Sequence, residues 1–269
     1  MNATQNKVIV VTGGGSGIVR ALTLRLVNAG AHVAAIDIHE NTLQETQGLA
    51  GPHKGHISLH VVNVTERETV NALPEKVIAA HGVVDGLINC AGIIQPFVRI
   101  KDLEFDAIKR VMDVNLYGQI HMIKAFLPHL LARPEAHIVN ISSMGGFFPV
   151  PGQTMYGASK AAVKLLTEGL YAEMIGTNVH VTVVFPGAIA TNIAQNSGVV
   201  IAGLGNEQAH KFSATTAAVA AETIINGMVR NKFQVFIGQD ARMMDLLYRL
   251  NPRWATQFMF SKMKALLPD

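Results

Sequence analysis

Short apolar runs rich in β-branched residues alternate along the chain with longer stretches of helical periodicity. The runs cover residues 8–12, 32–37, 57–62, 86–89, 137–142, 179–185 and 234–237. Helical patterns separate them at residues 18–29, 66–80, 103–131, 154–175 and 215–230. Most of the runs are continuously apolar, which is typical of strands buried on both faces of a parallel sheet. The pattern therefore predicts a doubly wound α/β fold, with a seven-stranded parallel sheet and helices on both faces.

Two regions depart from this alternation. Residues 187–213 form a long insertion after a strand, and we expect a substrate loop there because connections of that length are usually lids or binding loops. Residues 239–269 predict two further helices separated by Pro252. No internal repeat, low-complexity tract or linker interrupts the pattern, which indicates a single domain over residues 1–269.

Composition narrows the class of protein. Hydrophobic residues make up 49% of the chain and charged residues 15%, which is typical of a globular protein. The formal charge of +3 is spread without a basic run, so a nucleic-acid partner is not indicated. The single cysteine, Cys90, allows no intrachain disulfide and favours a reducing, cytoplasmic compartment. The sequence shows neither the apolar core of a signal peptide nor an apolar run long enough to span a membrane.

The first predicted strand runs into a glycine-rich turn, Thr12-Gly13-Gly14-Gly15-Ser16-Gly17-Ile18. Glycines let the backbone turn tightly and approach a pyrophosphate, and the following helix N-terminus offers free N–H groups. Because the turn lies between a predicted strand and a predicted helix, it predicts a dinucleotide site on a Rossmann-type sheet.

The end of the second predicted strand indicates which dinucleotide is bound. Asp37 lies there, where a carboxylate accepts both ribose hydroxyls of NAD and repels the extra phosphate of NADP. Neither the glycine turn nor Ile38 supplies an Arg or Lys for that phosphate. The sequence therefore favours NAD as the cofactor.

Tyr156 and Lys160 lie four residues apart, which places both on one face of a predicted helix. A nearby cation favours the phenolate and lowers the pKa of a tyrosine below its free value of about 10. This spacing therefore predicts a phenol that acts as a general acid or base near neutral pH.

Together these motifs resemble those of the short-chain dehydrogenase/reductase family, over the chain up to about Gly238. The ordered set comprises the glycine turn, Asn89-Cys90-Ala91-Gly92, Asn115, Ser142-Ser143, Tyr156, Lys160 and Pro186-Gly187 to Thr191. Ser143 precedes Tyr156 by thirteen residues, as in the family's catalytic pair. The resemblance implies an oxidoreductase that interconverts an alcohol and a ketone by hydride transfer.

The resemblance also implies roles for single residues. Tyr156 would give or take the hydroxyl proton, and Ser143 would hydrogen-bond the substrate oxygen. Lys160 would bind the nicotinamide ribose and hold down the pKa of Tyr156, and Asn115 would hold a water that passes protons from Lys160 to solvent. The residues implied to contact the cofactor are Gly13, Gly15, Ser16, Gly17, Ile18, Asp37, Asn63, Val64, Asn89, Ala91, Gly92, Tyr156, Lys160, Pro186, Gly187, Ile189 and Thr191.

The sequence departs from the family pattern at two positions. Val19 stands where a third glycine is usual and adds three carbons close to the pyrophosphate. Overpacking typically costs about 1–3 kcal/mol, so we expect Val19 to weaken NAD binding or to shift the first helix. Asn63 replaces an aspartate that commonly accepts a hydrogen bond from the adenine amino group, and its carbonyl is able to make the same bond.

Two weaker patterns allow more than one interpretation. His53, His56 and His60 are candidate metal ligands, but no cysteine or carboxylate set lies nearby, which favours exposed loop histidines. Three interpretations fit the apolar and basic tail, residues 239–269. It packs on a neighbouring subunit, it covers the substrate cleft, or it lies on an anionic membrane surface. We favour packing, because apolar stripes are more often core or interface.

The residues around the predicted Ser–Tyr pair are apolar: Met144, Phe147, Phe148, Val150, Met155 and residues 199–204. A hydrophobic alcohol or ketone therefore fits better than an acidic substrate. The leading hypothesis is an NAD-dependent alcohol dehydrogenase or carbonyl reductase. Similar proteins pair the helices that correspond to residues 103–131 and 154–175, which suggests a homodimer or homotetramer. The alternatives are a non-catalytic dinucleotide sensor impaired by Val19 and a membrane-peripheral dehydrogenase of lipids, steroids or retinoids.

Overall fold

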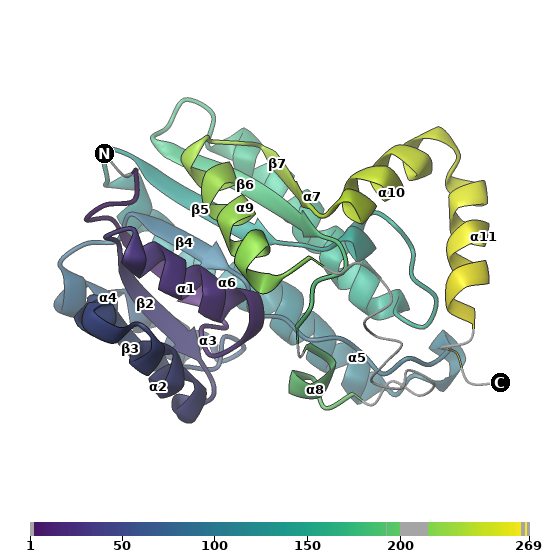
Figure 1. Cartoon of the computed structure of the whole chain (residues 1–269), viewed down its shortest axis with the longest axis horizontal. Helices are drawn as coiled ribbons and strands as arrows, with labels where there is room; N and C mark the ends of the chain where they lie inside the picture. Colours follow the sequence, from purple (N-terminus) through teal and green to yellow (C-terminus); the bar gives the residue numbers. More distant parts are fainter. Residues whose placement is uncertain (1–2, 192, 200–214, 265–266, 268–269) are drawn as a thin grey trace.

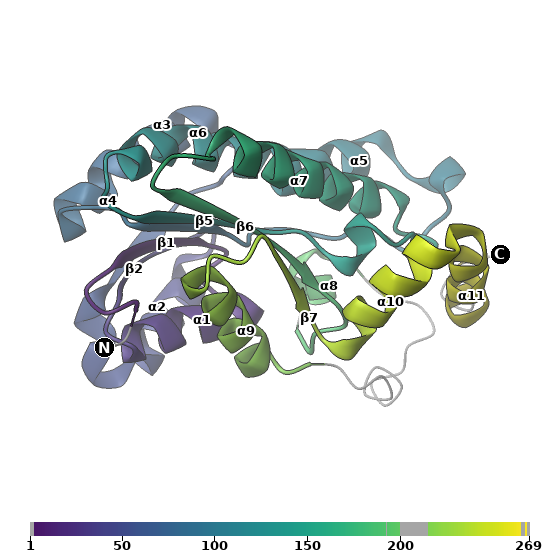
Figure 2. The same ribbon diagram turned by 90° about the horizontal axis from the view of Figure 1, so that it is seen from above.

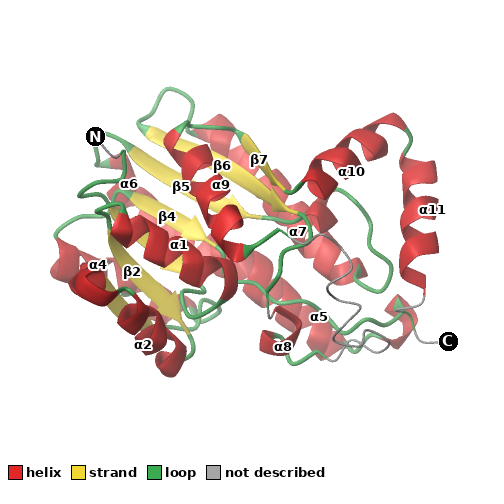
Figure 3. Ribbon diagram, viewed as in Figure 1, coloured by secondary structure: helices red, strands yellow, loops and turns green. Residues whose placement is uncertain are grey.

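A seven-stranded parallel sheet forms the centre of the protein in a computed structural model, which describes residues 3–191, 193–199, 215–264 and 267 (Figure 1). The strands are β1 (Val8–Thr12), β2 (His32–Asp37), β3 (Ile57–Val61), β4 (Gly86–Asn89), β5 (Ala136–Ile141), β6 (Val179–Pro186) and β7 (Gln234–Ile237). Their order is β3-β2-β1-β4-β5-β6-β7, and each neighbouring pair is parallel. Figure 3 shows the sheet in yellow with the helices in red. The predicted doubly wound fold is confirmed.

Helices cover both faces of this sheet (Figure 2). One face carries α1 (Gly17–Asn28), α2 (Glu40–Leu49) and α9 (Ala217–Val229). The other face carries α3 (Arg67–Asn71), α4 (Leu73–His81), α5 (Phe105–Met112), α6 (Gly118–Leu131) and α7 (Thr154–Glu173). The short α8 (Ile193–Asn196) follows β6, and α10 (Gln239–Leu250) and α11 (Pro252–Met263) extend beyond one end of the sheet. In the described ranges, no helix is long and apolar enough to cross a bilayer.

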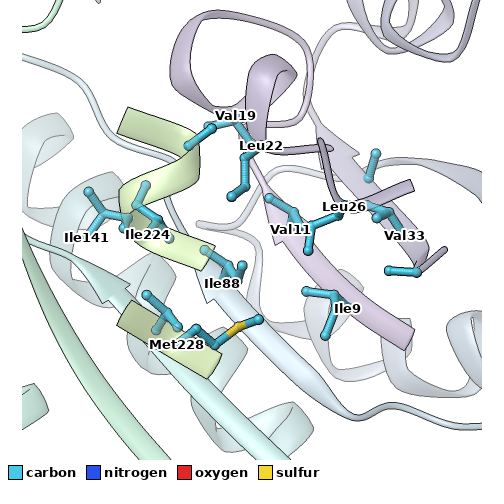
Figure 4. Close-up of a cluster of buried hydrophobic side chains, with 14 of the residues drawn as sticks. Ile9, Val11, Val19, Leu22, Leu26, Val33, Ile88, Ile141, Ile224 and Met228 are labelled. Carbon is cyan, nitrogen blue, oxygen red and sulfur yellow. The ribbon is translucent and has the colours of Figure 1, made fainter. Parts of the chain in front are cut away.

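A buried apolar layer lies on each face of the sheet. Along β1, Ile9 and Val11 point into the layer under α1 and α9, whereas Val8 and Val10 point into the layer under α4 and α6. Figure 4 shows the first layer, where side chains of α1 and α9 meet those of the central strands. Burying one such side chain contributes about 1.5–3 kcal/mol, so both layers stabilise the sheet that positions the site.

The helix predicted at residues 103–131 is interrupted. After the turn η2 (Ile100–Asp102), α5 ends at Met112, a π-helical segment η3 (Asp113–Tyr117) follows, and α6 begins at Gly118. π turns inside helices are rare and often occur at functional sites. This one carries Asn115, whose side chain is completely buried. One wider turn changes the helical period too little to be seen in the sequence.

Other element boundaries also differ from the predictions. The helix predicted at residues 66–80 is two helices, α3 and α4, because Pro74 lies in the first turn of α4 and lacks the N–H needed to continue α3. Pro252 does not merely separate the tail helices but begins α11, a favoured position for proline. The apolar pattern of the sequence also did not predict α2, α8, the turn η1 (Gly51–His56) or the turn η4 (Met144–Gly146).

The histidines of η1 and β3 are half-buried, so the interpretation of His53, His56 and His60 as exposed loop residues is wrong. The His56 ring stacks on that of His32 at 4.5 Å. The Ser58 hydroxyl lies between His60 and His81, at 2.8 and 2.7 Å, and burial lowers the pKa of both. No group of three possible metal ligands occurs in the part of the chain that the structure describes.

Candidate active site

The turns after the strands meet at the carboxyl edge of the sheet and line a cavity of about 630 Å³. At this edge β1 has β2 on one side and β4 on the other, and ligands of doubly wound sheets bind at such a reversal of strand order. The predicted residues on the cavity wall are Gly13, Ser16, Gly17, Ile18, Asp37, Asn63, Val64, Ala91, Gly92, Ser143, Tyr156, Lys160, Pro186, Gly187, Ile189 and Thr191. Gly15, Asn89 and Asn115 lie behind the wall.

The glycine turn is held by its neighbours. Gly13 adopts a φ of +84°, a left-handed conformation that suits glycine, and its N–H donates to the Ile36 carbonyl at 2.7 Å. A side chain on Gly13 would approach the Ala91 Cα to 3.3 Å. Because α1 begins at Gly17 on the wall, the cavity receives the electropositive end of a helix.

Thr12 connects β1 to β4 where the strand order reverses. Its Oγ1 accepts hydrogen bonds from the N–H groups of Cys90 at 3.0 Å and Ala91 at 3.1 Å. We did not predict Thr12 as a site residue, although it opens the glycine motif. Its role depends on partners 78 and 79 residues away, which no local pattern reveals.

The carboxylate of Asp37 lies on the cavity wall in a fixed orientation. Its Oδ2 accepts a hydrogen bond from the Gly15 N–H at 2.9 Å, and its Oδ1 accepts one from the His39 N–H at 3.1 Å. Gly15 itself faces α2, where any side chain would collide with Thr42. This glycine therefore orients Asp37 rather than lining the cavity.

Asn89 holds the central strands together. Its side-chain amide donates to Asn140 Oδ1 on β5 at 2.9 Å, and Asn140 in turn donates to Thr167 on α7 at 3.0 Å. The next residue, Cys90, does line the cavity, but burial raises the pKa of its thiol to about 11. The thiol therefore stays protonated and unreactive near neutral pH.

Ser143, Tyr156 and Lys160 reach the wall from two elements. Ser143 follows β5, whereas α7 carries Tyr156 and Lys160 one turn apart. The Ser142 hydroxyl donates to the Lys160 carbonyl at 2.7 Å, which fixes α7 against the end of β5. The structure thus brings together the three residues that the family motifs imply.

Burial governs the titration of both groups on α7. It raises the pKa of Tyr156 more than the hydrogen bond of Ser143 lowers it, and it lowers the pKa of Lys160 to about 8. The Lys160 Nζ donates to the Ile141 carbonyl at 3.0 Å and lies 6.0 Å from the centre of the Tyr156 ring. The protein alone therefore does not produce the expected lowering of the Tyr156 pKa, because the effect of burial outweighs that of the Ser143 hydrogen bond.

Asn115 is fully engaged behind the wall. Its Oδ1 accepts from the Ile93 N–H at 2.8 Å, and its Nδ2 donates to the Ile93 carbonyl and to Ser159 Oγ, both at 3.0 Å. A side chain on Gly92 would approach Lys160 Nζ to 3.1 Å and Asn115 Oδ1 to 3.2 Å. Gly92 therefore leaves a small polar space between the lysine and the asparagine.

Two residues that the sequence did not single out fasten the site. Asp240, in the first turn of α10, accepts a hydrogen bond from the Ala188 N–H at 2.6 Å, and a side chain on Gly187 would collide with it. Asn196 of α8 donates to Ser16 Oγ at 2.8 Å and so connects the predicted substrate loop to the glycine turn. No signal in the sequence relates residues so far apart.

The apolar residues expected beside the substrate do not line the cavity. Met144, Phe147 and Phe148 instead pack with Met244 and Met259 of the two tail helices in a third apolar cluster. This packing explains part of the apolar pattern of the tail. Val199 is buried, and residues 200–204 lie outside the described residues.

Residues 7–199 match the family model of the short chain dehydrogenases. The chain belongs to this family. It is therefore an oxidoreductase of the short-chain dehydrogenase/reductase type, built on a Rossmann-like sheet.

Similar proteins agree with this assignment. SadH of Mycobacterium tuberculosis is 38% identical over 259 residues, which cover 93% of this chain and 92% of SadH. The 3-oxoacyl-(acyl-carrier-protein) reductase FabG of Thermotoga maritima is 37% identical over 71% of this chain and 77% of FabG. The crystal structure of a short chain dehydrogenase/reductase from Burkholderia phymatum in complex with NAD has a TM-score of 0.85 and 25% identity, and covers 94% of this chain and 96% of its own.

Proposed function

We propose that this oxidoreductase is an NAD-dependent alcohol dehydrogenase or carbonyl reductase that acts on a hydrophobic secondary alcohol or ketone. The observation that supports this best is the shared cavity, in which Ser143, Tyr156 and Lys160 lie with the glycine turn and Asp37. Hydride transfer requires that the proton-transfer group and the dinucleotide lie in the same cavity. The wall also includes Ile93, Ile94 and Ile193, which favours an apolar substrate.

The residues present fit a dinucleotide. The glycine turn leaves backbone where side chains would fill the space, Asp37 and Asn63 border one part of the cavity, and Pro186 and Thr191 border another. When bound, the nicotinamide ring supplies or accepts the hydride. Asp37 would hold the adenosine ribose, and residues 186–191 would hold the nicotinamide carboxamide.

The choice of NAD over NADP rests on Asp37. A neighbour of the same fold, ElxO with NADP bound, has a TM-score of 0.74 and 24% identity, so the fold alone does not select the cofactor. In this chain a carboxylate with both oxygens hydrogen-bonded to backbone N–H groups occupies the end of β2. Such a carboxylate repels a 2′-phosphate and accepts hydrogen bonds from the ribose hydroxyls.

The side chains divide the proton chemistry between them. With its raised pKa, Tyr156 is protonated at neutral pH and donates its proton to the carbonyl oxygen during reduction. Ser143 hydrogen-bonds the same oxygen, and a protonated Lys160 stabilises the phenolate that remains. The space at Gly92 between Lys160 and Asn115 would hold the water that returns a proton.

We further propose a cytoplasmic, single-domain protein that forms a homodimer or homotetramer through α5, α6 and α7. Large apolar side chains are exposed on this helical layer, with Phe105 at 85%, Leu165 at 70% and Tyr117 at 50%. Exposed apolar groups on one layer are typical of an interface between subunits.

Titration with NAD and NADP, followed by a panel of apolar secondary alcohols and ketones, tests the proposal at the nicotinamide absorbance. We expect turnover with NAD and a loss of kcat of roughly 100- to 10,000-fold in Tyr156→Phe, with NAD binding retained. Turnover only with NADP would overturn the Asp37 argument. NAD binding without turnover of any compound would instead favour a dinucleotide sensor.

A further inference from the structure

The first turn of α7, which carries Tyr156, donates backbone hydrogen bonds to a residue outside its own helix. Gln95 lies in the loop after β4, and its side chain is completely buried. Its Oε1 accepts hydrogen bonds from the backbone N–H groups of Met155 at 2.8 Å and Tyr156 at 3.0 Å. Helix N-termini normally obtain such acceptors from a Ser, Thr, Asp or Asn directly before the helix. In α7 that position is Gln153, whose side chain makes no capping bond.

Gln95 has one possible orientation in this site. Its Nε2 donates to the Gly152 carbonyl at 2.9 Å, while its own backbone carbonyl accepts from Gln153 Nε2 at 2.8 Å. The side-chain oxygen and the amide nitrogen therefore each have a partner on the segment that leads into α7. If the side-chain oxygen and nitrogen were exchanged, the NH₂ group would face the two helix N–H groups, and the oxygen would face the Gly152 carbonyl.

The residues before Gln95 contact other parts of the active site. Ile93 bonds to Asn115 through both its backbone groups, and the Ile94 N–H donates to Ser197 Oγ, after α8, at 3.0 Å. Three consecutive residues of one loop thus hold the π turn, the predicted substrate loop and the catalytic helix. A displacement of this loop moves all three relative to the cavity.

We propose that Gln95 is a positioning residue, whose side chain caps α7 from across the site and thereby places the Tyr156 phenol for proton transfer. The proposal rests on the proposed function. Glutamine suits the position because it caps the helix without adding a charge. The groups that face Tyr156 are Lys160 on its own helix, Ser143 after β5 and Cys90 after β4. A carboxylate at position 95 would disfavour the phenolate among these groups.

Three variants separate positioning from general stability. Gln95→Leu removes the acceptor and the donor while keeping an apolar side chain in the buried site. Gln95→Glu keeps the acceptor, and its protonated form also keeps the donor to the Gly152 carbonyl. Gln153→Leu is the matched control, because Gln153 is 3% exposed and its side chain bonds to the same loop but not to the N–H groups of α7.

Each variant is compared with the wild type by kcat and KM against pH, and by hydrogen–deuterium exchange over residues 154–158. We expect Gln95→Leu to lose kcat on the order of 100-fold, because a misplacement of about 1 Å has that effect, with the KM for NAD little changed. Exchange of the first turn should rise in the same variant. Gln95→Glu should recover kcat at low pH and lose it as the carboxyl group ionises, whereas Gln153→Leu should keep the wild-type pH profile.

A wild-type kcat in Gln95→Leu would overturn the proposal, as would a Gln95→Glu variant no better than Gln95→Leu at any pH. Failure of the proposed function looks different, since the wild type itself would then show no turnover with NAD. In that case the exchange measurement still decides whether Gln95 caps α7, and unchanged protection in Gln95→Leu would refute the capping.

Discussion

Burial determines how Lys160, on the wall of the candidate active site, titrates. Lys160 is 4% exposed, and desolvation lowers its pKa from 10.5 to about 8. The unfolded chain therefore binds this proton more tightly than the folded chain, so folding at neutral pH must desolvate a charged group. The resulting cost is fully present below the folded pKa and disappears as the pH rises towards the unfolded value. At pH of about 7 it amounts to about 3 kcal/mol.

We expect Lys160→Met to abolish turnover and to raise the free energy of unfolding at neutral pH by up to about 3 kcal/mol. The gain should shrink above the pKa of about 8 and vanish near the unfolded value of 10.5. Denaturant unfolding at neutral and alkaline pH measures this difference. Lys164→Met is the control, because Lys164 lies one turn later, is only half-buried and pairs with Glu168 at 2.8 Å. A less stable Lys160→Met at neutral pH would mean that the bond to Ile141 outweighs the desolvation.

At the scale of elements, the periodic pattern predicted the strands well and the irregular helices poorly. α2 was missed because only Leu43 and Thr46 are buried in it, so its sequence has too few apolar positions to show a stripe. The π turn around Asn115 and the break before Pro74 were missed because helix periodicity averages over single turns. These irregularities depend on what each turn packs against.

The place of Val19 in α1 changes the interpretation of this departure from the family pattern. Val19 is 6% exposed and belongs to the apolar layer with Leu22, yet it also borders the cavity (Figure 4). A Cβ atom placed on Gly13 would lie 3.5 Å from the Cγ2 of Val19, which is an ordinary van der Waals distance. Val19 therefore fills space between α1 and the glycine turn without a collision inside the protein.

Val19→Gly should separate the stability of α1 from cofactor binding. Loss of the buried side chain and the low helix propensity of glycine should together lower the free energy of unfolding by about 3 kcal/mol. NAD should bind more tightly, because the turn then comes closer to the pyrophosphate. Denaturant unfolding and an NAD titration measure the two effects, and Val19→Ala controls for helix propensity. An unchanged Kd in both variants would remove Val19 as a determinant of affinity.

At the scale of the whole molecule, two of the surfaces that carry exposed apolar side chains are candidates for association between subunits. One is the outer side of α5–α7, and the other is the pair of tail helices, with Leu250 at 73%, Leu246 at 58% and Trp254 at 49% exposed. Other apolar residues of the tail, among them Met244, Ala255 and Met259, pack in one cluster with Phe148. Proteins of this size rarely leave two such surfaces uncovered.

Leu165→Glu should dissociate the proposed oligomer without unfolding the subunit, since a charge on an exposed position of α7 penalises an apolar interface but not the core. Sedimentation velocity measures the mass, and thermal unfolding checks the fold. Leu246→Glu is the matched change on α10. If only the tail variant dissociates, the subunits associate through α10 and α11, and a monomeric wild type would contradict the oligomer altogether.

The sequence alone determined the sheet and predicted the glycine turn and Asp37, and the family resemblance of its motifs implied the Ser143–Tyr156–Lys160 set. Strand burial and each of these motifs are local properties, because each is written in a short segment of the chain, the longest of which runs from Ser143 to Lys160. Only the tertiary structure decided that Gln95 caps α7, that Asp240 fastens Ala188 and that burial raises the pKa of Tyr156. Each of these depends on partners that the chain brings together from far apart, and on the exclusion of water that follows, which no local pattern contains.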